Sequence, residues 1–239
     1  MRALWVTVVL VSSLAIEAHA KCAGEWVKVA PANEVELPPR PHLLVTLGGR
    51  FQSVDVGSEL ELVSGQRRVA VEVVNRFKGY SQVVALVRPV KPLAPARWAL
   101  QLSKQAKQQL GRALGSWQVG KTVDTTAPRF MSAPAAGKTA WAEYGCGPGS
   151  SLEVTTAASD EPNAFVEAAV TIDGKVTSAL FAPNERGDFD LGHGMCSGAF
   201  SFEPGTGVSV VLTPIDLSGN RGGSSAPLSF VAPGPSRER

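Results

Sequence analysis

Short apolar or alternating runs, separated by glycine, proline, asparagine and aspartate, make up most of the chain after residue 40. In one of them, Trp98, Leu100 and Leu102 alternate with polar or small residues, which is the period of a half-buried strand. The regular spacing of such runs predicts an all-β protein built from β-sandwiches. The predicted strands cover residues 42–47, 59–63, 68–74, 82–87, 97–102, 117–119, 151–156, 164–172, 175–181, 188–191, 200–202, 208–215 and 228–231.

Two local features complete this pattern. Asp173-Gly174 separates two predicted strands and is typical of a type I′ hairpin turn. Residues 103–114 are rich in Lys, Gln and Ala and are compatible with a turn or two of helix. We interpret this stretch as a polar excursion between strands.

The chain is long enough for two domains, each with its own core. Residues 124–128 (DTTAP) interrupt the apolar alternation and end in a proline that favours extended backbone before it. The sequence therefore predicts domains at 21–123 and 129–232, a linker at 124–128 and a disordered tail at 233–239.

Residues 1–20 have the pattern of a secretory signal peptide. Arg2 is followed by an apolar stretch and then by Ala18-His19-Ala20, a small-x-small cleavage site. No other window approaches the roughly 20 apolar residues of a transmembrane helix. We expect an exported protein, in the periplasm or at the cell surface, that begins at Lys21.

Charge and cysteine content refine this expectation. The 23 basic and 21 acidic residues give a net charge of +2, which provides no electrostatic argument for binding nucleic acid. In an oxidising compartment two of the three cysteines are expected to pair. Cys146 and Cys196, both in the second half, form the predicted disulfide, and Cys22 is left as the odd thiol.

A family resemblance follows from the second half. The connector DTTAP, the strand and turn VVLTPIDLSGN (residues 210–220) and the closing strand APLSFV (residues 226–231) resemble a bacterial immunoglobulin-like domain of envelope proteins. The first half resembles the same superfamily more loosely, through its proline-rich segment before LLVTL. The resemblance implies two tandem immunoglobulin-like (fibronectin III-like) β-sandwich domains after the signal peptide, and it implies a fold rather than an activity.

Three weak metal hypotheses arise from this sequence. Asp216 and Asn220 could supply oxygen ligands to calcium, although a turn capped by its own aspartate explains them better. Asp188 and Asp190 share one face of a predicted strand close to His193, which we place on a mobile loop between two glycines. The third hypothesis is copper carriage.

The copper hypothesis depends on a resemblance at the signal junction. The string AHA resembles the junction of periplasmic copper-resistance carriers, in which cleavage before His19 would expose an amino-terminal ligand. His42, the other candidate in the first half, precedes a strand and is interpreted as a surface residue. With so few imidazoles, no metal or other cofactor is predicted.

No motif for nucleophilic or metal-dependent hydrolysis is present, so we predict a non-catalytic protein. A hydrolase with an unrecognised carboxylate pair and a periplasmic metal carrier are the alternatives. The predicted function is a binding or structural module of the bacterial envelope whose partner is a protein or a glycan. Loop ends of a sandwich carry such contacts, and the candidate residues are Trp141, Tyr144, Arg186, His193 and Arg221.

Overall fold

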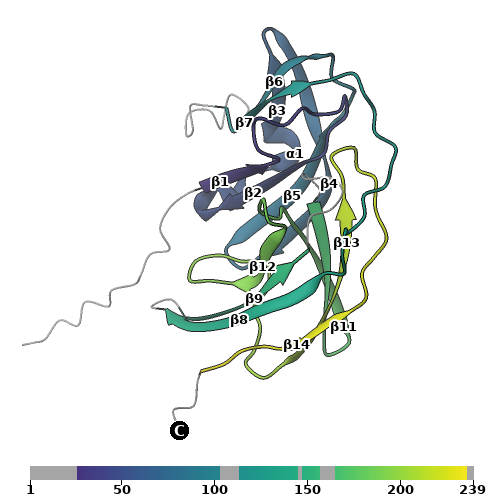
Figure 1. The fold of residues 1–239 in the computed structure, drawn as a ribbon. Helices are drawn as coiled ribbons and strands as arrows, with labels where there is room; N and C mark the ends of the chain where they lie inside the picture. Colours follow the sequence, from purple (N-terminus) through teal and green to yellow (C-terminus); the bar gives the residue numbers. More distant parts are fainter. Residues whose placement is uncertain (1–25, 103–112, 145–146, 157–164, 236–239) are drawn as a thin grey trace, which may run out of the picture.

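The computed structural model describes residues 26–102, 113–144, 147–156 and 165–235, and its regular structure is almost entirely antiparallel β-sheet (Figure 1). Within these ranges no helix is long and apolar enough to cross a membrane. Residues 103–112 of the predicted helical stretch and residues 236–239 of the predicted tail lie outside the described residues, as do the signal peptide and Cys22.

The first half of the chain forms one seven-stranded sheet in the order β1-β2-β5-β4-β3-β6-β7. A short 3-10 helix at Gly49–Ser53 and the four-residue helix α1 at Val56–Glu59 lie between β2 and β3. Asp55 caps α1 through its side chain. The strands are β1 (Trp26–Ala30), β2 (Leu43–Gly48), β3 (Leu60–Ser64), β4 (Arg67–Gly79), β5 (Gln82–Pro89), β6 (Ala96–Leu102) and β7 (Gly115–Val119).

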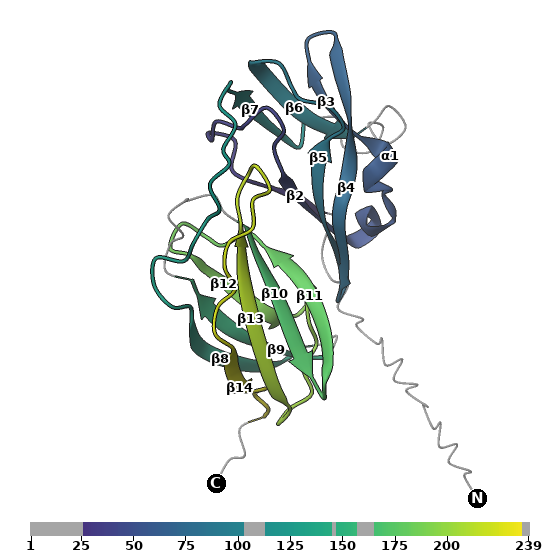
Figure 2. The ribbon, with the colours of Figure 1, turned by 90° about the vertical axis from the view of Figure 1, so that its right-hand side faces the viewer.

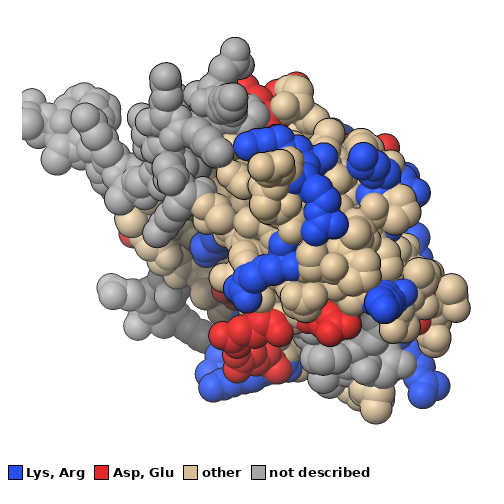
Figure 3. Space-filling model, turned by 90° about the horizontal axis from the view of Figure 1, so that it is seen from above, with Lys and Arg blue, Asp and Glu red and all other residues tan. Residues whose placement is uncertain are grey.

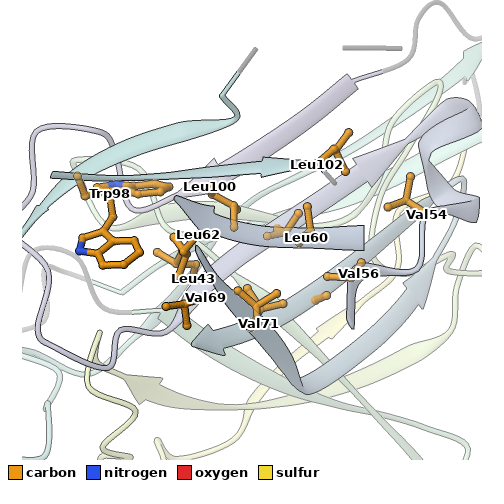
Figure 4. Packing of buried hydrophobic residues seen from close by; sticks show 14 of the residues in the cluster. Leu43, Val54, Val56, Leu60, Leu62, Val69, Val71, Trp98, Leu100 and Leu102 are labelled. Carbon is orange, nitrogen blue, oxygen red and sulfur yellow. The ribbon is translucent and has the colours of Figure 1, made fainter. Parts of the chain in front are cut away.

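This sheet curls until it is nearly a barrel. The long strand β4 changes register against β5 between Val73 and Asn75, and such a bulge bends a strand. A parallel bridge between Leu37, in the segment that connects β1 to β2, and Val119 of the last strand β7 forms a seam. The Trp117 indole N–H donates to the carbonyls of Pro31 and Ala32 across the same seam, at 3.1 and 3.0 Å. Buried leucines, valines and two tryptophans fill the interior (Figure 4).

The second half of the chain forms two sheets that face each other across a separate apolar core (Figure 2). One sheet has the order β11-β10-β13-β14 and the other the order β12-β9-β8. The strands are β8 (Ala135–Tyr144), β9 (Gly147–Thr155), β10 (Phe165–Ile172), β11 (Lys175–Phe181), β12 (Asp188–His193), β13 (Gly207–Ile215) and β14 (Leu228–Val231).

The all-β prediction is confirmed, and most predicted strands are present within one or two residues. Asp173 and Gly174 both have positive φ between β10 and β11, as a type I′ turn requires. Strands β1 and β8 were not predicted. The predicted strand at 200–202 is wrong: Phe200 and Phe202 are buried in the core, but their backbone belongs to no strand.

The two halves are in contact through a third apolar cluster. Leu44, Val84 and Leu86 of the first sheet pack against Phe165, Leu180 and Ile215 of the second half. Backbone hydrogen bonds lie beside this cluster. Tyr80 and Gly198 exchange two of them, at 2.9 and 3.1 Å, and the His42 N–H donates to the Leu217 carbonyl at 2.7 Å. The halves therefore share a packed and hydrogen-bonded interface.

Candidate functional site: a cavity between the two halves

A cavity of about 620 Å³ lies between the halves, with part of the shared apolar cluster in its wall. Its volume is within the range of about 300–1,000 Å³ that is typical of ligand pockets. Strands β2 and β5 contribute alternate residues, so the cavity meets one face of the sheet there. Strands β1 and β11 contribute consecutive residues, 28–30 and 180–181, so the cavity meets their edges.

The cavity wall combines aromatic and polar side chains from both halves. Trp26 lines it from β1 and Tyr144 from the end of β8. Lys28 and Asp190 bring opposite charges from the two halves, and the Lys28 Nζ lies 5.3 Å from the centre of the Trp26 ring. Gln82 adds an amide that can donate and accept hydrogen bonds. Such a wall can bind a polar ligand with extended apolar surface.

His193 also lies at this cavity, and its predicted position on a mobile loop is wrong. It is the last residue of β12 and is only 7% exposed. Its Nδ1 lies 3.1 Å from the Phe200 carbonyl and its Nε2 lies 2.9 Å from the Pro148 carbonyl. Its ring packs on Tyr80 of the first half, with 4.7 Å between ring centres. Because both nitrogens face main-chain carbonyls, His193 is positioned as a structural residue.

The prediction that His42 is a surface residue is also wrong. It is only 5% exposed, and its Nδ1 is buried without a hydrogen-bond partner. The imidazole lies directly against Gly219, whose φ of +88° belongs to the turn between residues 216 and 220. Burial lowers the pKa of His42 below 6.5, and the nearby Arg88 guanidinium lowers it further. His42 is therefore an uncharged contact between the halves.

We expect His42 to make the stability of the protein depend on pH. Because its pKa is lower in the folded chain, the unfolded chain binds the proton first as the pH falls below about 6.5. The free energy of unfolding should therefore decrease as the pH drops from 7 through this range and level off below the folded pKa. Urea denaturation at a series of pH values measures this dependence.

His42→Gln is the matched variant, since it leaves His193 in place. The difference between the two pH profiles isolates His42, and identical profiles would show that it contributes nothing.

Asp216 and Asn220, the calcium candidates, form a closed turn in the structure. Asp216 is fully buried. One of its carboxylate oxygens accepts the Asn220 backbone N–H at 2.8 Å, and the other accepts the Asn220 side-chain amide at 2.6 Å. The same amide donates to the Asp124 carbonyl at 3.0 Å. These hydrogen bonds attach the turn to the connector between the halves.

The remaining metal candidates are the two aspartates of β12 and His19. Asp188 and Asp190 lie on one face of β12, with Phe189 and Leu191 buried on the opposite face, as the alternation predicted. In the described part of the chain no three side chains of His, Cys, Asp or Glu gather in an arrangement that could hold a metal ion. His19 lies outside the described residues.

The structure brings two of the five predicted partner-binding residues, Tyr144 and His193, to the same cavity. Trp141 is half-buried within β8. Arg186 is exposed between β11 and β12, and Arg221 forms an ion pair with Glu167. Neither arginine is among the residues that line the cavity.

Of the two cysteines of the predicted disulfide, one lies within the described residues. Cys196 is half-buried and carries a free thiol among the described residues, while Cys146 lies outside them. The segments that flank the two cysteines are nevertheless neighbours. The Pro148 carbonyl contacts the His193 ring, and Ser150 is paired with His193 across β9 and β12.

Basic and acidic side chains are mixed with uncharged ones on the face of the first half that Figure 3 shows. In the view of Figure 3, basic side chains alternate with uncharged ones over the end of this half, and no single basic patch is visible. Some arginines there are neutralised: Arg68 pairs with Glu61, and Glu72 pairs with both Arg40 and Arg88. These ion pairs hold the pKa of Glu72 below its usual value.

Comparisons with known proteins assign the chain to no family. No protein-family profile and no curated protein matches the chain. Among solved structures, a type I pullulanase from Bacillus subtilis is 10% identical over 87% of this chain, with a TM-score of 0.26. The chain spans only 24% of that enzyme. A chain of a cytokine receptor complex is 10% identical, with 87% of this chain and 98% of that chain covered and a TM-score of 0.28. These comparisons assign the chain to no family, and its all-β class rests on the sheets described above.

Proposed function

We propose that the protein is an exported, non-catalytic binding module of the bacterial cell envelope, and that its ligand occupies the cavity between the two halves. The observation that carries the proposal is the cavity itself, whose walls come from both halves. Packing and backbone hydrogen bonds already join these halves. A site that is formed before binding costs less ordering free energy when the ligand arrives.

Binding is favoured over hydrolysis with a histidine base by the positions of the two described histidines. Both nitrogens of His193 are directed at main-chain carbonyls, and His42 is buried under the turn at Gly219. A general base needs an accessible nitrogen within hydrogen-bond reach of the substrate. Their burial also argues against metal binding by these two histidines, because a ligating imidazole needs a nitrogen that the metal can reach.

We further propose that the second half is an immunoglobulin-like β-sandwich. Support comes from its two facing sheets and from the turn between Asp216 and Asn220, which follows the next-to-last strand as in such domains. The first half departs from a tandem arrangement of two sandwiches, since its seven strands form one curled sheet. We therefore limit the immunoglobulin-like proposal to the second half.

Export and the Cys146–Cys196 disulfide belong to the same proposal. Intact mass and amino-terminal sequencing of the exported protein test both. We expect a chain that begins at Lys21 and gains about two mass units on reduction. A chain that begins at His19 and retains copper would favour the carrier instead.

The cavity can be tested by filling it. Gly194 lines the cavity, is exposed and has no atom near the position of an added Cβ. We expect the fluorescently labelled protein to bind isolated envelopes of its own cells saturably, and Gly194→Trp to weaken this binding by about tenfold, or about 1.4 kcal/mol. Gly223→Trp, at an equally open glycine outside the cavity, is the control and should bind like the unmodified protein. Equal binding by both variants, or no saturable binding, would contradict the proposal.

A further inference from the structure

The cavity is bordered by strand edges that have no neighbour among the described strands. Strands β1, β11 and β12 are each the end strand of their sheet, and residues of all three line the cavity. The backbone N–H and C=O groups of an end strand are satisfied on one side only, so such an edge can pair with another extended chain.

On the outer edge of β12, the hydrogen bonds within the protein indicate which backbone groups are still available to an added strand. The Asp188 carbonyl accepts the Asn184 N–H and the Gly192 carbonyl accepts the Ala199 N–H, both on the side away from β9. Backbone groups alternate in direction along an antiparallel strand, so those of Asp190 point to this same side. The outer backbone groups of Asp188 and Gly192 are thus in use, and only Asp190 between them can bond to one residue of an added strand.

On β1 the free edge is longer. All five residues, Trp26–Ala30, pair with β2 in continuous register, and the described residues include no strand on the opposite side. Every second residue of β1 thus directs its N–H and C=O away from β2. This edge is long enough for an extended segment of about five residues.

Side chains on β1 indicate the chemistry of that segment. Lys28 is exposed, lines the cavity and has no ion pair among the described residues, so it can meet a carboxylate. Trp26 covers Gly48 so closely that a Cβ there would overlap the indole ring. The indole is thereby held over β2, on the face of the sheet that lines the cavity.

We propose that the cavity binds an extended polypeptide segment, which adds as a strand to the outer edge of β1 and places an acidic side chain against Lys28. The inference depends on the proposed function, because it names the ligand of the same cavity. Main-chain hydrogen bonds supply affinity in this binding mode, and side-chain contacts supply selectivity. The acidic residue is the main element of selectivity here.

Strand addition has a characteristic chemical test. Octapeptides selected from a random displayed library against the mature protein should be enriched in Asp and Glu. In the best peptide, N-methylation at alternate positions should weaken binding by about tenfold, the cost of one lost hydrogen bond, while the intervening positions tolerate it. Lys28→Glu should weaken the same peptide by tenfold or more, and Lys91→Glu, an exposed charge change outside the cavity, should not.

Other outcomes separate this inference from the proposed function. Envelopes treated with a broad protease should lose the saturable binding that Gly194→Trp weakens. If that binding survives protease but is competed by soluble envelope oligosaccharides, the ligand is a glycan, and the peptide inference is wrong while the proposed function stands. Selected peptides that bind Gly194→Trp equally well, or that show no alternation on N-methylation, also overturn the inference.

Discussion

Gly198→Ala is expected to lower the free energy of unfolding by about 3 kcal/mol, because the backbone of the two halves meets at this residue. An added Cβ would overlap the Gly192 carbonyl and the His193 Cα. These are backbone atoms of β12, which cannot rotate away as a side chain can. The methyl group would push residue 198 off β12 and break its paired hydrogen bonds with Tyr80.

Urea denaturation, followed by tryptophan fluorescence and far-ultraviolet circular dichroism, measures this change. Gly194→Ala is the control, four residues away in the same segment, with open space around its Cβ. Its free energy of unfolding should change by less than about 1 kcal/mol. If the two variants unfold at the same urea concentration, the backbone contact at Gly198 does not limit stability.

Asp216→Ala should have an effect of similar size for a different reason. The substitution leaves the Asn220 backbone N–H and side-chain amide without their carboxylate acceptors in a buried turn. Hydrogen bonds to a charged group contribute roughly 1.5–3 kcal/mol each, so we expect a loss of about 3 kcal/mol. Urea denaturation measures the loss.

Because Asn220 also binds the Asp124 carbonyl, the connector should become more accessible in this variant. The rate of limited proteolysis near residues 124–128 measures this accessibility. Asp190→Ala, which removes an exposed carboxylate, is the control and should change neither stability nor proteolysis. Unaltered proteolysis of Asp216→Ala would show that the turn does not restrain the connector.

The elements that the sequence predicted correctly are those whose signal is local. The alternation of Trp98, Leu100 and Leu102 reflects one buried face of β6, and Asp173-Gly174 determines its own turn. Strand β8 was missed because Ala135–Tyr144 is an end strand that is exposed along most of its length, so burial imposes no alternation on it. Strand β1 is another end strand and is only five residues long.

The failures at the candidate site have a different origin. His42 is buried by the turn at Gly219, and His193 by Tyr80 and the Phe200 segment, and these contacts join distant parts of the chain. The residues that adjoin each histidine in the sequence carry no signal of such burial. The cavity likewise needs β1 from one end of the chain and β12 from the other. The opposite error occurred at Phe200 and Phe202, where alternating apolar residues predicted a strand. Both side chains are buried, but the backbone that carries them is not in a strand.

The seam of the first half has a consequence for the order of folding. The sheet closes only when the segment after β1 meets β7, through the Leu37–Val119 bridge and the Trp117 indole. These partners are about eighty residues apart, and contacts of such long range slow folding because the loop entropy is lost first. On the proposed export route, a chain that crosses the membrane from its amino terminus therefore cannot complete its first core until residue 119 has emerged. Until then the apolar face of the open sheet is exposed to chaperones and proteases.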